Sequence, residues 1–258
     1  FAIKRCTVTQ SGATSGIWFS AAVTGSVSIE DTTVVSGGTA IQFDNLQAPA
    51  TLFNVAAAAT VSGHGLDFIA VSGAATLISI TGGSFAGIER GIYFQIVPAM
   101  TTIAISNAKV KSTGTVTHAL HFSGAVAGPV SIKGVTVTHA AGFVGIRFQS
   151  AVTAPVLIAD CTINTGNAAI MMSNLQAPVT ITNVVGTAAT TGSGLEFGLL
   201  SAGATSISIT GGSFKGVEGG IIFPAVDAAT DITIDSVELE ATGSVAPALY
   251  FSSTVAGP

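Results

Sequence analysis

The chain has 258 residues, of which 48% are hydrophobic and only 8% are charged, and its formal net charge is −5. This apolar content is ample for a folded core, so the composition excludes a disordered chain. No run of about 18 or more apolar residues occurs, which excludes a membrane-spanning helix. The dispersed acidic charge gives no basic surface for nucleic acid.

Residues 1–129 and 130–258 align without a gap. Asn45–Pro49 returns as Asn174–Pro178, and Ile80–Phe85 returns as Ile209–Phe214. A long exact period predicts repeat architecture. We therefore expect two modules, 1–129 and 130–258, continuous in one solenoid. Because the chain begins without Met, lacks a signal peptide and ends at the phase where it began, we expect a section of a longer tandem array or a mature polymer unit.

Each module contains five shorter repeats that share one signature: a small residue, an aliphatic residue, any residue, and then Phe. Its ten copies begin at residues 16, 40, 65, 91, 119, 145, 169, 194, 220 and 248, so the repeats are 24 to 28 residues long. An alternation of aliphatic and other residues precedes each copy, as in Val27–Val34 and Ile103–Val110. A period of two predicts strands with one buried face.

One turn-type residue separates the two alternating segments of each repeat. In chain order the column reads Arg5, Asp31, Asn54, Gly82, Asn107, Gly134, Asp160, Asn183, Gly211 and Ser236. Asn, Asp and Gly tolerate the left-handed conformation, in which one residue bends a strand sharply without a loop. We therefore expect a bend at this column, with Arg5 and Ser236 as departures from the preferred residue types.

A repeat of about 25 residues with three short strands and tight bends predicts one coil of a β-solenoid. Helical repeats are disfavoured because no segment keeps a 3.6-residue period and glycine is dense. The pattern resembles the right-handed parallel β-helix superfamily, which includes pectate lyases, phage tailspikes and filamentous-haemagglutinin-type adhesins. The resemblance covers the whole chain and implies an all-β, right-handed parallel β-helix of about ten coils. It leaves the function open, because that fold serves lyases, adhesins and fibres alike.

Stacked coils turn each repeat position into a column. The aliphatic and Phe positions of the signature predict two internal ladders, with Met172 replacing one Phe. The position between them faces outward and mixes aromatic, charged and aliphatic residues. We interpret it as a candidate lateral contact between rods, the alternative being an ordinary mixed surface. The candidate contact residues are Trp18, Tyr93, His121, Arg147, Met171, Ile222 and Tyr250.

Signals for catalysis or metal binding are weak. The acidic residues are sparse and concentrate near the end of the chain, at Asp227, Asp231, Asp235, Glu238 and Glu240. The four histidines (His64, His118, His121 and His139) lack a metal-ligand pattern. Cys6 and Cys161 occupy one repeat position in different coils, too far apart to pair. We therefore expect no catalytic residue, no metal, no cofactor and no enzymatic activity.

These observations favour a structural protein: a β-solenoid segment of an extracellular or cell-surface filament. Its expected partner is itself, through further copies or continued repeats, and surface glycans are a second candidate partner. Neither a nucleic acid partner nor a membrane-spanning segment is expected. Three alternatives stay open: an adhesin stalk or passenger-type segment, a carbohydrate-active β-helix enzyme, and an ice-binding solenoid.

Overall fold

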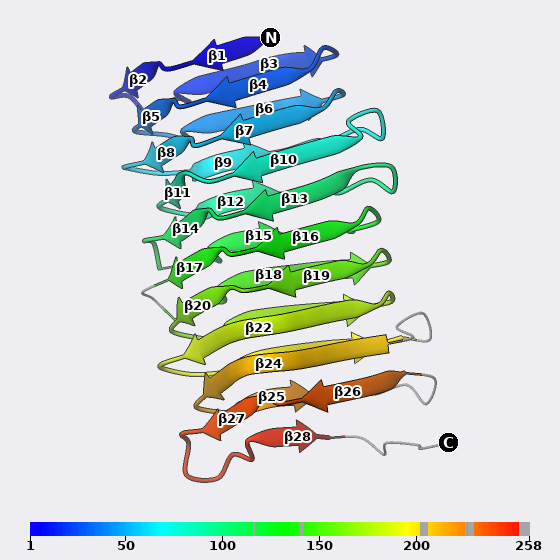
Figure 1. Cartoon of the computed structure of the whole chain (residues 1–258). Coiled ribbons are helices and arrows are strands. Elements are labelled where there is room, and N and C mark those ends of the chain that lie inside the picture. Colours follow the sequence, from blue (N-terminus) through cyan, green and yellow to red (C-terminus); the bar gives the residue numbers. More distant parts are fainter. Residues whose placement is uncertain (116, 140–141, 202–205, 225, 227–229, 253–258) are drawn as a thin grey trace.

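The computed structural model describes residues 1–115, 117–139, 142–201, 206–224, 226 and 230–252. The end of the second expected module, residues 253–258, and Asp227 lie outside the described residues. The described chain is a parallel β-solenoid of about nine turns, without a helix, which confirms the predicted fold class. Figure 1 shows the coils stacked along one axis, with the N-terminal strand and the C-terminal strand at opposite ends.

Each coil contributes strands to three faces, which we name the first, second and third sheets. The first sheet contains the strand that precedes the bend in each coil. Its members are β1 (Ala2–Lys4), β4 (Val27–Glu30), β7 (Ala50–Phe53), β10 (Leu77–Thr81), β13 (Thr102–Ser106), β16 (Val130–Lys133), β19 (Val156–Ala159), the first parts of β22 (Val179–Ala188) and β24 (Ser206–Gly216), and β26 (Asp231–Asp235).

The second sheet contains the strand that follows the bend. Its members are β2 (Thr7–Gln10), β5 (Thr33–Ser36), β8 (Ala56–Ala59), β11 (Ser84–Gly87), β14 (Lys109–Ser112), β17 (Thr136–His139), β20 (Thr162–Thr165), the last parts of β22 and β24, and β27 (Glu238–Ala241). Because β22 and β24 run through the bend without a break, the first two sheets join into one bent 18-stranded sheet.

The third sheet carries the repeat signature and has ten strands. They are β3 (Ile17–Val23), β6 (Ile41–Leu46), β9 (His64–Phe68), β12 (Arg90–Phe94), β15 (Leu120–Phe122), β18 (Ile146–Val152), β21 (Ile170–Leu175), β23 (Ser193–Leu200), β25 (Gly219–Phe223) and β28 (Leu249–Phe251).

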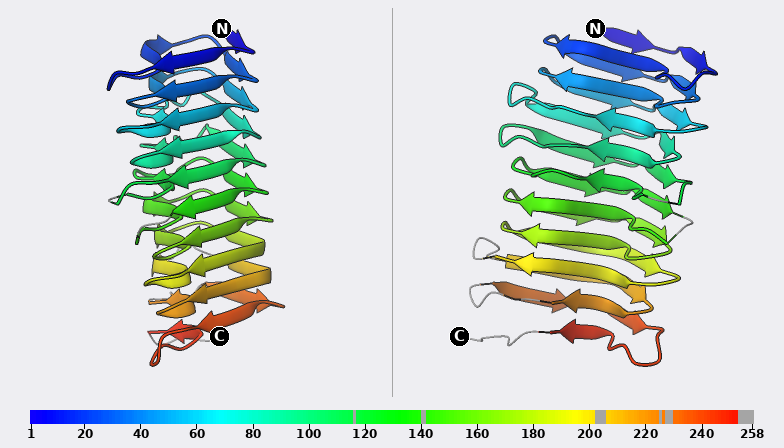
Figure 2. Two further views of the ribbon diagram at one scale, coloured as in Figure 1. Left: turned by 90° about the vertical axis from the view of Figure 1, so that its left-hand side faces the viewer. Right: turned by 180° about the vertical axis from the view of Figure 1, so that it is seen from behind.

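The handedness of the coil follows from the strand directions. In Figure 1 the first sheet faces the viewer and its strands run to the left, while the third sheet lies behind and its strands run to the right. The chain descends from the N-terminus, so the coil is right-handed. In the right-hand view of Figure 2, from behind, the third sheet faces the viewer and its strands run to the left, as this hand requires. This is the hand that twisted parallel strands favour in their crossovers.

The bend between the first and second sheets falls at the predicted column. Every member of that column has a positive φ, from 46° at Asp31 to 67° at Gly82, and the departures Arg5 and Ser236 are included. Neighbouring turn residues also bond to each other, since Asn54 Nδ2 donates to Asp31 Oδ1 at 2.8 Å. The local conformation and this side-chain bond together explain the preference for Asn and Asp.

Asn107, at the bend between β13 and β14, has a φ of 53°. We expect Asn107→Val to lower the free energy of unfolding by about 1–3 kcal/mol, because a β-branched residue is strained in this region. Asn107→Gly, which removes the side chain but keeps this conformation accessible, should change it by much less. Denaturant unfolding followed by circular dichroism measures both variants. Equal midpoints for Val and Gly would contradict the assignment of the column.

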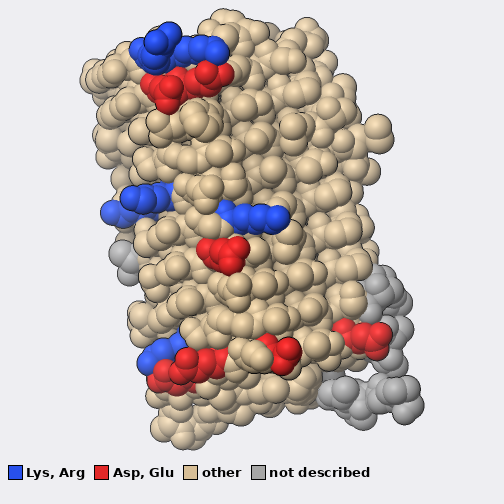
Figure 3. Space-filling view, viewed as in Figure 1, with Lys and Arg blue, Asp and Glu red and all other residues tan. Residues whose placement is uncertain are grey.

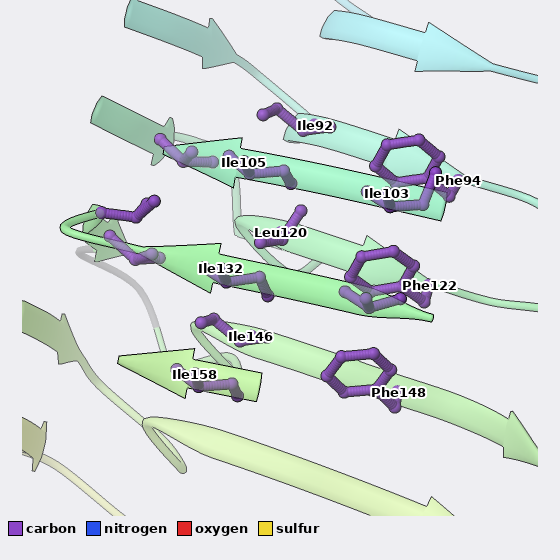
Figure 4. Close-up of a cluster of buried hydrophobic side chains, with 14 of the residues drawn as sticks. Ile92, Phe94, Ile103, Ile105, Leu120, Phe122, Ile132, Ile146, Phe148 and Ile158 are labelled. Carbon is purple, nitrogen blue, oxygen red and sulfur yellow. The ribbon is translucent and has the colours of Figure 1, made fainter. Parts of the chain in front are cut away.

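The core contains the predicted ladders. Phe94, Phe122 and Phe148 stack nearly parallel, with ring centroids 5.0 and 4.6 Å apart, and all three are fully buried. Figure 4 shows these rings on the third sheet opposite aliphatic side chains of the first sheet. Met172 is fully buried in the Phe column, and stacking resumes between Phe197 and Phe223 at 4.9 Å. Equivalent side chains, stacked from one coil to the next, therefore fill the solenoid.

Candidate functional site

The third sheet, the end of β17 and the segments that connect them carry an unusual group of polar and aromatic side chains near the middle of the rod. The four histidines of the chain are linked there by ring contacts, with centroids 4.8 to 6.0 Å apart. The chain of contacts runs through His64, Tyr93, His121, His118, Phe143 and His139. With Asp67, Glu89, Arg90, Arg147 and Gln149, these residues form what we name the histidine–arginine cluster.

The strand pattern explains why three members of the cluster, Tyr93, His121 and Arg147, share the outer face of the third sheet. Ile92 and Phe94 of β12 point into the core, so Tyr93 between them points outward. Tyr93 pairs in register with His121 of β15, which pairs with Arg147 of β18. Three successive coils therefore place an aromatic, an imidazole and a guanidinium group in one column, at the strand spacing of about 4.8 Å.

Arg90 lies between the histidines and is held mainly by neutral groups. Its Nε donates to His121 Nδ1 at 2.9 Å. This bond leaves the proton of the imidazole on Nε2, which donates to Gln149 Oε1 at 2.8 Å. The guanidinium also lies over the ring of Tyr93, with Cζ 4.3 Å from the centroid, in a cation–π contact. The tautomer of His121 is thus set by its two partners.

His64 stands between Arg90 and two carboxylates. Its Nε2 lies 3.4 Å from Arg90 Nη1, 3.8 Å from Asp67 Oδ2 and 3.7 Å from Glu89 Oε2. Burial, helped by the charge of Arg90, lowers the pKa of His64 to about 3. Burial raises the pKa of Asp67 to about 7, against the effect of Arg90. Near neutral pH, His64 is therefore uncharged and Asp67 is divided between its protonated and ionised forms.

His118 packs edge-on against His121 and accepts a hydrogen bond at Nδ1 from the backbone N–H of Val144, at 3.3 Å. Its Nε2 lies 3.4 Å from Arg147 Nη1. Burial lowers the pKa of His118 to about 3 and that of His121 to about 4, and nearby charges, Arg90 and Arg147 among them, add to the effect. The imidazoles of His64, His118 and His121 are therefore neutral donors and acceptors at physiological pH.

A hollow of about 280 Å³ adjoins the cluster on the side of the first coils. Trp18, which is 57% exposed, lines it together with Gln42 and Glu89. Trp18 Nε1 donates to Asp44 Oδ2 at 2.9 Å, and Gln42 Nε2 donates to Asp44 Oδ1 at 2.7 Å. The indole is thus fixed in orientation beside an open polar surface, and Glu89 belongs to both the hollow and the cluster.

The predicted lateral-contact column is a true structural column, but its members differ in exposure. Trp18 and Tyr250 are exposed, at 57% and 43%, whereas His121 is only 3% exposed. His121 therefore offers almost no surface to another rod. The other members are half-buried: Tyr93, Arg147, Met171 and Ile222. Lateral contact through the column stays a prediction, and it rests on the exposed members.

Sequence reasoning missed the cluster because it searched for metal-ligand spacing within short segments. The cluster could have been found from the positions at which the second module departs from the first. The residues 129 positions after His64, Arg90 and His121 are Ser193, Gly219 and Tyr250. The core and the acidic positions of the cluster therefore repeat, whereas these histidines and this arginine do not. The members of the cluster also come from coils about 25 residues apart, which only the stacking brings together.

Charge is scarce on the rest of the surface. Figure 3 shows a largely uncharged face with a few small groups of basic and acidic residues. Two of these contain ion pairs, Lys4–Glu30 at 2.9 Å and Lys215–Glu240 at 2.7 Å. Asp231, Asp235, Glu238 and Glu240 are exposed on the last described coil and do not converge on one point, since they divide between the first and second sheets.

Within the described ranges, no group of three or more His, Cys, Asp or Glu side chains is arranged to hold a metal ion. Cys6 is exposed, Cys161 is buried, and both are free thiols. No described segment forms a helix long and apolar enough to cross a membrane. In comparisons with known proteins, no family model, no curated protein and no solved structure matches this chain.

Proposed function

We propose that this chain is a non-enzymatic structural segment of an extracellular or cell-surface filament, built by stacking solenoid modules end to end. The observation that carries the proposal is the boundary between the two modules. β16 pairs with β13 in register, and Ile103 N donates to Pro129 O at 2.9 Å. Across the same boundary Phe122 and Phe148 stack at 4.6 Å. One module therefore follows another as an ordinary coil, with no break in either ladder.

The first coil and the last described coil each present apolar side chains on which another coil could stack. Ile17 and Phe19 in the first coil, and Ile234 and Phe251 in the last described coil, are only partly buried, whereas their counterparts in interior coils are fully buried. Covering them would remove apolar surface from water, at about 25 cal/mol per Å². Unpaired strand edges at such ends also favour pairing with another strand.

Charge at the two ends is complementary. The strand registers place Lys4 and Asp235 in one column, in the first coil and in the last described coil. A second copy stacked on the last coil would therefore bring its Lys4 about 4.8 Å beyond Asp235. The apolar ladders and this ion pair support head-to-tail stacking in a single register.

We expect the 258-residue chain to form thin, unbranched filaments above a critical concentration, visible by electron microscopy and measurable by light scattering. Lys4→Glu should raise that concentration on the order of ten-fold, because repulsion replaces attraction at each junction. The double variant that combines Lys4→Glu with Asp235→Lys should return the critical concentration to near the wild-type value. Lys109→Glu, an equal charge change at an exposed lysine in mid-rod, is the matched control and should have little effect. Compact monodisperse particles at every concentration would overturn the proposal.

A carbohydrate-active enzyme is a second candidate, favoured by one observation. Asp67, with its raised pKa, and Glu89 both lie within 4 Å of His64 Nε2, and pairs of carboxyl groups with different pKa values serve glycoside hydrolysis. We prefer the structural function because Asp67 is 6% exposed and does not line the neighbouring hollow. If the wild-type chain cleaves a polysaccharide and Glu89→Gln abolishes this cleavage, the enzymatic function becomes the better explanation.

A further inference from the structure

Two hydrogen-bond donors, one on Arg147 and one on His118, face each other without an acceptor between them. The backbone N–H of Val144 donates to His118 Nδ1, so the proton of this neutral imidazole is on Nε2. That Nε2–H lies 3.4 Å from Arg147 Nη1, which is also a donor. Two donors therefore face each other, and neither can satisfy the other.

Arg147 has no direct ion-pair partner among the described residues, and the charge of Glu196 reaches it only from a distance. The Nε of Arg147 is buried and has no hydrogen-bond partner. No carboxylate of the described residues forms an ion pair with it within 4.0 Å, whereas Lys4, Lys215 and Arg90 each have one. Glu196, in the same outward column, is separated from Arg147 by Met171 of the intervening strand. Arg147 as a whole is half-buried, but its Nε is removed from water, and a buried donor without an acceptor is costly.

Gln149 adds a further donor. Gln149 follows two residues later on the same face of β18, and its Oε1 is used by His121 Nε2, which leaves its amide N–H₂ group to donate. The imidazoles cannot supply negative charge, and Arg90 lies on the far side of His121. The guanidinium of Arg147 thus faces the imidazole N–H of His118, and the amide N–H₂ of Gln149 lies on the same face of β18 as Arg147.

We propose that Arg147, His118 and Gln149 form a binding site for a small oxyanion, namely a carboxylate, sulfate or phosphate group. Such a group would accept from Arg147 and from His118 Nε2–H, which resolves the contact between the two donors. Charge-assisted bonds from a planar guanidinium suit two oxygens of one anion. The site occurs once in the two modules, because the position equivalent to Arg147 in the first module is Trp18. A filament of this chain would therefore carry one anion site per 258 residues.

The test is binding of inorganic sulfate, inorganic phosphate and acetate to the full chain, each measured separately by calorimetry at constant ionic strength with chloride as the reference. NMR of the histidine side chains supplies a local readout. We expect at least one of the three anions to bind and to shift the Nε2 signal of His118 while leaving His64 nearly unchanged. The three arms show which oxyanion chemistry the site takes.

Arg147→Gln should weaken binding at least ten-fold, about the effect of losing one charge-assisted hydrogen bond. Arg147→Lys keeps the positive charge but lacks the planar, two-pronged donor group of arginine, so its anion affinity should lie between those of Arg147→Gln and the wild type. Lys109→Gln is the matched control, because it removes an exposed lysine elsewhere on the rod, and it should bind within about two-fold of the wild type. The proposal is wrong if no anion binds, or if Arg147→Gln binds as tightly as Lys109→Gln. Circular dichroism confirms that each variant remains folded.

Discussion

Replacing Phe122 with Ala should lower the free energy of unfolding by about 3–5 kcal/mol, the largest effect we expect from any single change in this chain. Phe122 is fully buried and stacks on Phe94 and Phe148, at 5.0 and 4.6 Å. Its loss removes two stacking contacts and leaves a cavity that parallel strands at fixed spacing cannot close. Urea unfolding followed by circular dichroism measures the change.

Phe122→Met is the matched control, since the chain itself places Met172 at this position in another coil. A methionine fills the slot without polar atoms, so we expect it to cost less than about 1.5 kcal/mol. Phe85→Ala, in the second sheet, tests whether the penalty depends on stacking, because Phe85 is equally buried but outside the aromatic column. If Phe122→Ala lowers the free energy of unfolding no more than Phe122→Met does, the aromatic ladder does not stabilise the rod.

Acidification should destabilise the middle of the rod between about pH 6.5 and pH 4. His64, His118 and His121 have pKa values of about 3, about 3 and about 4 in the fold, below their ordinary value of 6.5. In this window the unfolded chain binds protons at these residues and the folded chain does not, so stability falls as the pH falls. Each net proton corresponds to about 1.4 kcal/mol per pH unit, and the half-exposed His118 contributes least.

Asp67 acts in the opposite direction. Its pKa is raised from 3.8 to about 7, so between these values the folded chain holds a proton that the unfolded chain has lost. Asp67 therefore adds stability as the pH falls through 7, and it offsets one of the three histidines. Burial also raises the pKa of Glu196, which therefore acts in the same direction as Asp67. The three histidines outnumber these two carboxyl groups, so we expect net destabilisation in acid, which thermal unfolding at a series of pH values would measure.

The second module supplies the control for this pH dependence. His64→Ser combined with His121→Tyr introduces the residues that stand 129 positions later, Ser193 and Tyr250. We expect this double variant to have a flatter stability profile between pH 4 and 6.5, because two of the three histidines no longer titrate. An unchanged profile would show that other groups cause the loss of stability in acid.

Much of the fold is determined locally and could be predicted. The inward positions keep the two-residue period of strands, so the buried ladders follow from periodicity alone. The bend column was found residue by residue, and even Arg5 and Ser236, whose types do not favour it, adopt a positive φ of 52° and 55°. They do so because the coils stacked beside them fix the register, and each coil inherits the conformation of its neighbour.

The histidine–arginine cluster was decided only by the tertiary structure. Arg90 and His121 are 31 positions apart, and His121 and Gln149 are 28 apart, yet each pair forms a hydrogen bond at 2.9 or 2.8 Å. Outward positions follow no shared pattern, so their neighbours depend on which coils stack and on how the connecting segments cover the third sheet. By itself, the sequence determined the repeat, the strands, the bends and the core. The repeat also placed Tyr93, His121 and Arg147 in one column, but only the stacked structure showed that Arg90 and Gln149 bond to His121, because these residues stand at different positions of their repeats.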